Sequence, residues 1–214
     1  MLNDNQKRIL QLFQASSFLV DKFYFTGGTA LSECYLQHRY SDDLDFFSFE
    51  KHDSLEVHST VQNWSEQLKL TINSRTVENT QIYFLTFPDK SELKVDFAYY
   101  PYKNVGEFTK LGNTSVDSLL DIAVNKITVI GQRNDIKDFV DLYFLFQKFS
   151  VYDLFNYSNV KFRRDYDMLL LAADFSKIST FDYLPRMIVN LKLEDLKTYF
   201  ENLSAKLGFS VTSK

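Results

Sequence analysis

Cysteine is nearly absent from this sequence of 214 residues, since Cys34 is the only one. A single cysteine excludes an intrachain disulfide and a zinc site built from several cysteines. Glycine and proline are also scarce, with 6 and 3 residues respectively. We therefore expect long regular elements and few flexible linkers.

The sequence also lacks a long apolar run and a signal peptide. No apolar stretch approaches the ~20 residues that span a bilayer, and the N-terminus has no basic segment followed by an apolar one. We expect a soluble cytoplasmic protein without a membrane partner. The net charge of -4 argues against a non-specific nucleic-acid coat, which would be basic, but leaves a local basic groove open.

What the sequence does contain is material for a core, with 45% hydrophobic and 16% aromatic residues. Its periodicity predicts helices over residues 4–20, 29–38, 54–68, 115–130 and 137–149. It predicts strands over residues 23–25, 43–49, 70–77, 81–87 and 92–99. Helices that alternate with strands, followed by a meander, indicate an α+β fold. We place a sheet domain at 1–110 and a helical C-terminal lobe at 111–214, which together would form an active-site cleft.

A glycine pair stands between a predicted strand and a predicted helix, in Phe25-Thr26-Gly27-Gly28-Thr29. Glycine permits positive φ and lets a ligand approach the backbone closely. The N-terminus of the following helix offers unpaired N–H groups and a partial positive charge, which suit a phosphate. The alternative is a plain strand-to-helix turn, and Gly27-Gly28 alone does not decide between them.

Carboxylates on two predicted strands form the second feature. In the strand at 43–49, alternation places Asp43 and Asp45 on one face and Leu44 and Phe46 on the other. Paired carboxylates repel each other unless a cation lies between them, and Mg²⁺ prefers such oxygens. Asp96 on the strand at 92–99 is a candidate third carboxylate. A solvated strand edge, and for Asp96 a plain surface position, are the alternatives.

These residues resemble a known family when they are taken in order. The segment Thr26-Gly27-Gly28-Thr29-Ala30-Leu31, followed by His38-Arg39-x-Ser41-x-Asp43-Leu44-Asp45-Phe46-Phe47, resembles the AbiEii/AbiGii toxin family. Lys126 and residues 138–143 are similar to its later motifs. The family consists of nucleotidyltransferases of the DNA polymerase β-like superfamily, and its bacterial members are often toxins of toxin–antitoxin or abortive-infection systems.

The resemblance implies a nucleotidyltransferase-like mixed β-sheet flanked by helices, and it implies roles for single residues. Asp43, Asp45 and Asp96 would bind Mg²⁺, in a two-metal site with Mn²⁺ as the alternative ion, and Asp96 would also be a candidate general base. The residues that would contact the nucleotide are Gly27, Gly28, Thr29, Lys126 and Asp141, and Asp138 would position substrate or support Lys126. Arg39, just before the carboxylates, is a candidate partner of a nucleotide phosphate on its position alone, with Asp42 as the alternative partner. The superfamily often has Gly-Ser where this chain has Gly27-Gly28, so a hydroxyl contact would come from Thr29.

The helical residues carry a signal of their own. Lys126 falls within the apolar arc formed by Leu119, Ala123 and Ile127, so its ammonium group must extend outward or meet an anion. Asp138 and Asp141 lie in a segment that is apolar on nearly all sides, and buried acids need partners. Asp138 near the helix start is alternatively a cap.

A further basic cluster, Lys161, Arg163 and Arg164, is either a solvated face or a contact with an RNA backbone. The leading functional hypothesis is a metal-dependent enzyme that transfers a nucleoside monophosphate from an NTP to an acceptor hydroxyl of tRNA or another RNA, with a cognate antitoxin as a partner. The alternatives are a non-catalytic nucleotide-binding or interaction module and a small-molecule nucleotidyltransferase.

Overall fold

The computed structural model describes residues 1–212, with side chains for residues 1–209. The chain divides into two compact units, Met1–Ser118 and Leu119–Lys214. The second unit therefore begins later than the boundary predicted at residue 111. The reason is a hairpin of β6 (Thr109–Leu111) and β7 (Thr114–Val116), which joins the sheet of the first unit because β7 pairs with β1.

The first unit contains a seven-stranded sheet of order β3-β4-β5-β2-β1-β7-β6. The remaining strands are β1 (Tyr24–Thr26), β2 (Leu44–Ser48), β3 (Thr71–Val77), β4 (Thr80–Thr86) and β5 (Glu92–Tyr99). Strand β2 runs parallel to β5 and antiparallel to β1. The sheet is therefore mixed, and the predicted α+β fold class is confirmed.

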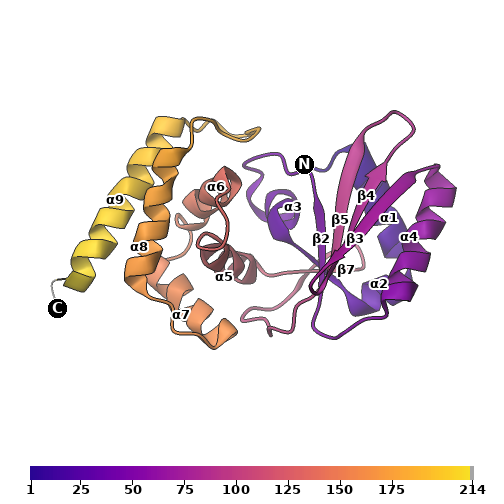
Figure 1. Cartoon of the computed structure of the whole chain (residues 1–214), viewed down its shortest axis with the longest axis horizontal. Coiled ribbons are helices and arrows are strands. Elements are labelled where there is room, and N and C mark those ends of the chain that lie inside the picture. The colour runs from indigo at the N-terminus through magenta and orange to yellow at the C-terminus, as the bar shows by residue number, and fades with distance from the viewer. Residues whose placement is uncertain (213–214) are drawn as a thin grey trace. The chain divides into compact units, whose positions relative to one another are not determined.

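One face of this sheet packs against the helices α1 (Asp4–Ala15), α2 (Ser17–Lys22) and α4 (Ser54–Leu68) (Figure 1). The ring of Phe46 on β2 stacks on Phe13 of α1 with centroids 4.0 Å apart. Phe97 on β5 approaches Trp64 of α4 at 6.3 Å. Aromatic rings from the strands thus fill the layer between the sheet and the helices.

The single helix predicted over residues 4–20 is wrong, because Ser16 interrupts it. The Ser16 backbone N–H bonds the carbonyl of Phe13 and closes α1, while its hydroxyl accepts from the N–H of Leu19 at 3.3 Å and caps α2. Serine competes with the helical backbone for hydrogen bonds, which is why it favours caps over helix interiors.

The glycine pair opens a short helix, α3 (Gly27–Leu31), which continues into a π-helical turn, η1 (Ser32–Leu36). Gln37 then adopts a left-handed conformation with φ of 50° and ends the helical segment. The helix predicted over residues 29–38 therefore starts earlier and ends earlier than expected. It leads directly into the turn before β2.

The second unit is helical. Its elements are α5 (Leu119–Val129), α6 (Ile136–Leu145), α7 (Val151–Phe162), α8 (Met168–Ser176), the 3₁₀ turn η2 (Lys177–Thr180) and α9 (Leu193–Thr212). Its core contains the ring of Phe200, which lies 5.1 Å from Phe139 and 5.3 Å from Phe175.

The helix predicted over residues 115–130 is wrong at its start, since Ser115 and Val116 belong to β7. Among residues 1–212, no helix is long and apolar enough to cross a membrane.

Candidate active site

The side chains of strand β2 point alternately toward the core and toward the candidate site. Leu44, Phe46 and Ser48 are buried, while Asp45 and Phe47 are half-buried on the opposite face, together with Asp43 just before the strand. Successive side chains of a strand point to opposite sides of the sheet. The structure therefore places both carboxylates on the face that α1, α2 and α4 do not cover.

The strand register brings Asp96 beside this pair. Asp45 on β2 lies directly opposite Asp96 on the parallel strand β5, and opposite Thr26 on β1. One carboxylate oxygen of Asp96, Oδ2, accepts a hydrogen bond from Lys94 Nζ at 2.6 Å. The other oxygen, Oδ1, is buried and has no hydrogen-bond partner. An unpaired buried carboxylate oxygen is costly, so this atom is a candidate ligand atom.

The charges on this face influence one another. Burial raises the pKa of Asp96, the salt bridge to Lys94 works against that rise, and the nearby charge of Asp43 adds to it. Burial alone would lower the pKa of Lys94, but Asp96, Asp45 and Asp43 together raise it. Lys94 was not singled out from the sequence, because nothing in the alternation of β5 distinguishes it from an exposed lysine.

A divalent cation fits the donor atoms of this face, although the side chains are not gathered around one point. Within the described part of the chain, no group of three His, Cys, Asp or Glu side chains stands ready to hold a metal ion. Lys94 engages one oxygen of Asp96. The oxygens of Asp43, Asp45 and Asp96 are nevertheless the hard donors that Mg²⁺ prefers, and Asp96 Oδ1 is without a partner.

The two glycines of the turn meet different steric demands. Gly27 has φ of +75°, and a Cβ atom there would lie 2.1 Å from Oδ2 of Asp45. A Cβ atom at Gly28 would lie 2.6 Å from Nη2 of Arg39. Gly27 therefore admits the carboxylate, and Gly28 admits the guanidinium group. Both positions require glycine because another group comes close to the backbone, as the sequence suggested. The groups that come close in this structure are side chains of the protein itself, Asp45 and Arg39.

Arg39 and Thr29 donate side-chain hydrogen bonds to backbone carbonyls close to the glycine turn. Arg39 is 1% exposed, and its Nη1 donates to the carbonyl of Tyr40 at 3.0 Å. The hydroxyl of Thr29 donates to the backbone carbonyl of Asp43. In this structure Thr29 therefore positions Asp43, and Arg39 lies beneath the turn. Contacts of Thr29 and Arg39 with a nucleotide stay predictions.

Asp117 is a buried residue that the sequence analysis missed. It follows β7 and is 0% exposed. Its carboxylate accepts from the Thr26 hydroxyl at 2.8 Å and from Asn104 Nδ2 at 2.7 Å, and its carbonyl accepts from the Tyr35 hydroxyl at 2.7 Å. It fixes the end of β1, directly before the glycine turn. It falls within the helix predicted over residues 115–130, and no periodic signal distinguishes it there.

In the second unit, Lys126 is buried and meets carboxylates. Its Nζ atom lies 2.7 Å from Oδ1 of Asp138 and 2.6 Å from Oδ2 of Asp141, both on α6. Of the two outcomes expected for this lysine, contact with an anion is the one observed. Contact of Lys126 or Asp141 with a nucleotide stays a prediction, because the ammonium group is engaged by carboxylates of its own unit.

Arg133 completes this network and was not identified from the sequence. Its Nε and Nη2 atoms donate to the two oxygens of Asp138 at 2.7 and 2.9 Å, while 55% of its side chain is exposed. Burial alone would raise the pKa of Asp138, but the charges of Lys126 and Arg133 outweigh burial and hold it below its usual value. Asp138 is therefore ionised and held from two sides.

The predicted basic cluster on α7 is wrong for Lys161. This lysine is buried and lies 2.7 Å from Oδ1 of Asp121, with both side chains 0% exposed. Arg163 and Arg164 are exposed at the end of α7. The Lys161–Asp121 pair joins α7 to α5 and has a structural role.

We predict that Gly27→Ala lowers the free energy of unfolding by at least about 2 kcal/mol. The left-handed backbone costs about 1 to 2 kcal/mol for a residue with a Cβ atom, and the new methyl group would displace the Asp45 carboxylate. Urea unfolding measures the effect. The matched control is Gly208→Ala, because among the described side chains and beyond the backbone of α9 itself nothing lies within 4 Å of its Cβ position, and alanine raises stability in a helix by about 0.5 to 1 kcal/mol. Equal effects of the two changes would contradict the steric role of Gly27.

We predict that Lys126→Met lowers the free energy of unfolding by about 3 to 5 kcal/mol, because it removes the buried cation that pairs with Asp141 and leaves Asp138 with Arg133 alone. Guanidinium unfolding followed by circular dichroism measures the change. Lys7→Met is the control, since Lys7 pairs with Asp4 in an exposed bridge and such pairs contribute about 0 to 1 kcal/mol. A loss below about 1 kcal/mol for Lys126→Met would show that the network is not structural.

Solved structures share the fold of the whole chain. A candidate nucleotidyltransferase from H. pylori matches with a TM-score of 0.60 and 19% identity, over 99% of this chain and 98% of that chain. The protein JHP933 from Helicobacter pylori matches with a TM-score of 0.58 and 18% identity, over 100% and 96%. MenT4, a nucleotidyltransferase toxin from Mycobacterium tuberculosis H37Rv, matches with a TM-score of 0.59 and 15% identity, over 95% and 81%.

Sequence comparison identifies the family. An uncharacterized protein of Aquifex aeolicus (strain VF5) is 34% identical over 135 residues, and the alignment spans 61% of this chain and 60% of that relative. The family model described as "Nucleotidyl transferase AbiEii toxin, Type IV TA system" matches residues 9–205. Because this match covers most of the chain, the protein belongs to the AbiEii toxin family, whose model is described as a nucleotidyl transferase, as the resemblance of its sequence motifs predicted.

Proposed function

We propose that this protein transfers a nucleoside monophosphate from an NTP to an acceptor hydroxyl of an RNA such as tRNA, in a reaction that depends on Mg²⁺. The observation that carries the proposal is the strand register, which sets Asp45 beside Asp96 and next to the glycine turn. Carboxylates next to an anion-binding turn are what metal-assisted transfer of a nucleotide requires.

The reaction forms one bond and breaks one bond at the α-phosphorus of the NTP. The acceptor oxygen bonds to the α-phosphorus, the bond from this phosphorus to the oxygen that bridges to the β-phosphate breaks, and pyrophosphate leaves with the electron pair. The backbone N–H groups at Gly27-Gly28 would bind the phosphates. Asp43, Asp45 and Asp96 would hold the cation, which supplies positive charge to the triphosphate and to the attacking oxygen.

Asp96 is our candidate to receive the proton of the acceptor hydroxyl. Its Oδ1 atom is buried and has no hydrogen-bond partner in the described part of the protein. A general base must lie within hydrogen-bond reach of the proton that it removes, and this oxygen is free to accept one. Lys94 holds the other oxygen of the same carboxylate and would orient the group for this role.

We predict that purified protein labels RNA when it is incubated with total RNA, Mg²⁺ and each of the four α-³²P-labelled NTPs in turn. Asp43→Asn/Asp45→Asn is expected to lower the rate by at least about 100-fold, since charge stabilisation by a metal contributes several kcal/mol to the transition state. Denaturing gels measure the labelled product. The matched control is Asp4→Asn, which removes one carboxylate charge from a side chain that is 89% exposed and paired with Lys7 in a surface bridge.

The alternative functions are distinguished by adding small-molecule acceptors to the labelling assay and by measuring the binding of NTPs separately. Transfer to aminoglycoside-like acceptors instead of RNA would indicate a small-molecule nucleotidyltransferase. Calorimetric binding of NTPs without labelling of any acceptor would indicate a non-catalytic module. Labelling of RNA that persists in the Asp43→Asn/Asp45→Asn variant would refute the proposed chemistry.

We also propose that the protein is the toxin of a type IV toxin–antitoxin pair and has a cognate antitoxin protein. The proposal is supported by membership of the AbiEii family, whose description names a type IV toxin–antitoxin system. Induced expression in a bacterial host without the antitoxin is expected to stop growth, and Asp43→Asn/Asp45→Asn is expected to abolish the arrest at equal protein level. Colony counts after induction measure the effect. Growth arrest that persists with the variant would show that the toxicity does not depend on nucleotidyl transfer.

A further inference from the structure

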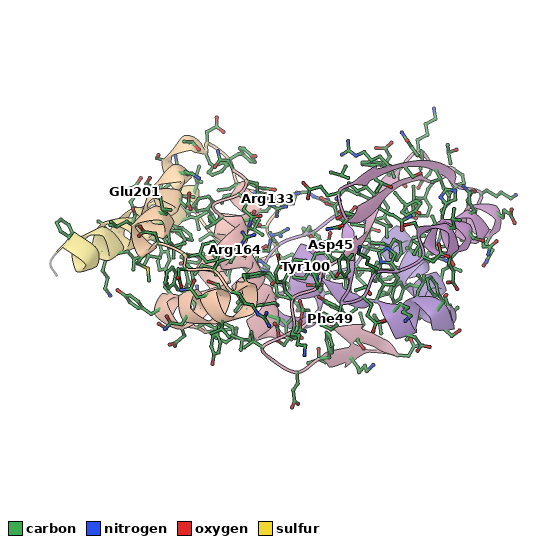
Figure 2. The ribbon with its side chains drawn as sticks, turned by 60° about the horizontal axis from the view of Figure 1, so that its bottom comes forward. Asp45, Phe49, Tyr100, Arg133, Arg164 and Glu201 are labelled. Carbon is green, nitrogen blue, oxygen red and sulfur yellow. The ribbon has the colours of Figure 1, made fainter. Side chains whose placement is uncertain are left out.

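Lys94 lies on the face of the sheet that carries the site carboxylates. It precedes Asp96 by two residues on β5, so both side chains point to the same side of the sheet. Parallel pairing of the strands aligns Asp96 with Asp45 of β2, which is labelled in Figure 2, and the same register brings Lys94 level with Asp43. The lysine therefore belongs to the site by strand register, although it lies outside the predicted set of site residues.

The ammonium group of Lys94 interacts with carboxylates of both strands. Its Nζ atom lies 2.6 Å from Oδ2 of Asp96. The negative charges of Asp96, Asp45 and Asp43 all attract it. Carboxylates that share one face repel one another unless positive charge lies near them. Lys94 supplies such a charge from within the chain.

Two lysine–aspartate contacts of the second unit show how exposed this pair is. Lys161 is 0% exposed and Lys126 is 8% exposed, and the aspartates that they contact are at most 1% exposed. In the first unit, Lys94 is 29% exposed and Asp96 is 13% exposed. A fully buried ion pair is costly to separate, whereas a partly exposed ammonium group can move into water on its flexible stem. Lys94 can therefore release its carboxylate at lower cost than the other two lysines.

The site carboxylates contact different neighbours in this structure. Oδ2 of Asp96 accepts from Lys94, while its Oδ1 atom is buried and without a hydrogen-bond partner in the described residues. Oδ2 of Asp45 lies close to Gly27, where a Cβ atom would be 2.1 Å from it. This is why, within residues 1–209, the three carboxylates do not form a group ready to hold a metal ion. A cation that binds carboxylates of both strands must compete with Lys94 for Asp96.

We propose that Lys94 acts as the site's own cation: its ammonium group neutralises Asp96 in the resting protein and competes with the divalent cation for this carboxylate. Lys94 thereby keeps the carboxylates of β2 and β5 side by side while no metal is bound, and it lowers the affinity of the site for metal. This inference rests on the proposed function for the identity of the cation. It adds a residue that regulates how the site is loaded with metal.

The test measures Mn²⁺ binding by the full chain without NTP or RNA, so that it does not depend on turnover. Electron paramagnetic resonance measures free Mn²⁺, and the bound fraction follows by difference. Lys94→Gln retains a hydrogen-bond donor but carries no charge, and it is expected to tighten Mn²⁺ binding at least about fivefold, because the competing positive charge is gone. Lys94→Arg keeps the charge and is expected to stay within about twofold of wild type.

The matched control is Lys22→Gln, which changes the net charge by the same amount. It removes the ammonium group from an exposed pair with Glu50 at 3.2 Å and is expected to leave Mn²⁺ affinity unchanged. Melting curves in EDTA and in Mn²⁺ establish that each variant is folded, and Mn²⁺ is expected to raise the Tm of Lys94→Gln more than that of wild type. A Lys94→Gln variant that folds only with Mn²⁺ would also support the proposal.

Two results would overturn the proposal. Mn²⁺ binding that is equal or weaker in Lys94→Gln would show that Lys94 only fixes the position of Asp96. Equal tightening in Lys94→Gln and Lys22→Gln would show that the effect comes from the net charge of the protein.

Failure of this inference is distinguishable from failure of the proposed function. Mn²⁺ binding that Asp43→Asn/Asp45→Asn abolishes but Lys94→Gln does not tighten would refute the role of Lys94 and leave the reaction standing. Tighter binding in Lys94→Gln, in a protein that labels no RNA, would uphold the role of Lys94 and refute the reaction. Absence of Mn²⁺ binding in both wild type and Lys94→Gln would refute the metal site and this inference together.

Discussion

The organisation of the first unit depends on strand β2, which has hydrogen-bonded neighbours on both sides and two faces of opposite character. Its partners β1 and β5 fix its register. Phe46 and Leu44 are fully buried on one face, and this burial holds Asp43 and Asp45 on the other. A slip of the register by one residue would exchange the faces and bury both carboxylates. The packing of the core therefore determines where the charges of the site lie.

The second unit contains buried charged side chains that are neutralised by partners within the unit. Lys126 lies within an apolar arc, and two carboxylates of α6 neutralise it, while the fork of Arg133 holds one of them. Lys161 and Asp121 form a second buried pair between α5 and α7. Such pairs contribute little net stability compared with apolar residues, but each member makes its partner indispensable. They therefore join α5 to α6 and α5 to α7 through charged contacts.

Much of the fold was predictable where local signals agree with tertiary structure. The bounds of α4 and β5 were predicted correctly, since Asp53 caps the former and alternation marks the latter. The start of the predicted helix at residue 115 was wrong, because pairing of β7 with β1 overrides local preference. The placement of Asp43 and Asp45 on one face followed from period-two alternation, whereas the position of Asp96 beside them comes from the register of β2 and β5. Lys94, Asp117 and Arg133 were missed, because their importance comes from partners that only the folded chain brings within reach.

The glycine pair has a consequence for how this sequence can vary. Gly27 leaves room for Asp45, and Gly28 leaves room for the guanidinium group of the buried Arg39. Each glycine is thus coupled to one distant position, and the two couplings are separate although the residues are adjacent. A Cβ atom at Gly28 would lie 2.6 Å from Arg39 Nη2 and 3.1 Å from Ser41 Oγ. A larger residue there therefore requires the Arg39 side chain to move or to shorten, and we expect substitutions at Gly28 and Arg39 to have non-additive effects on stability.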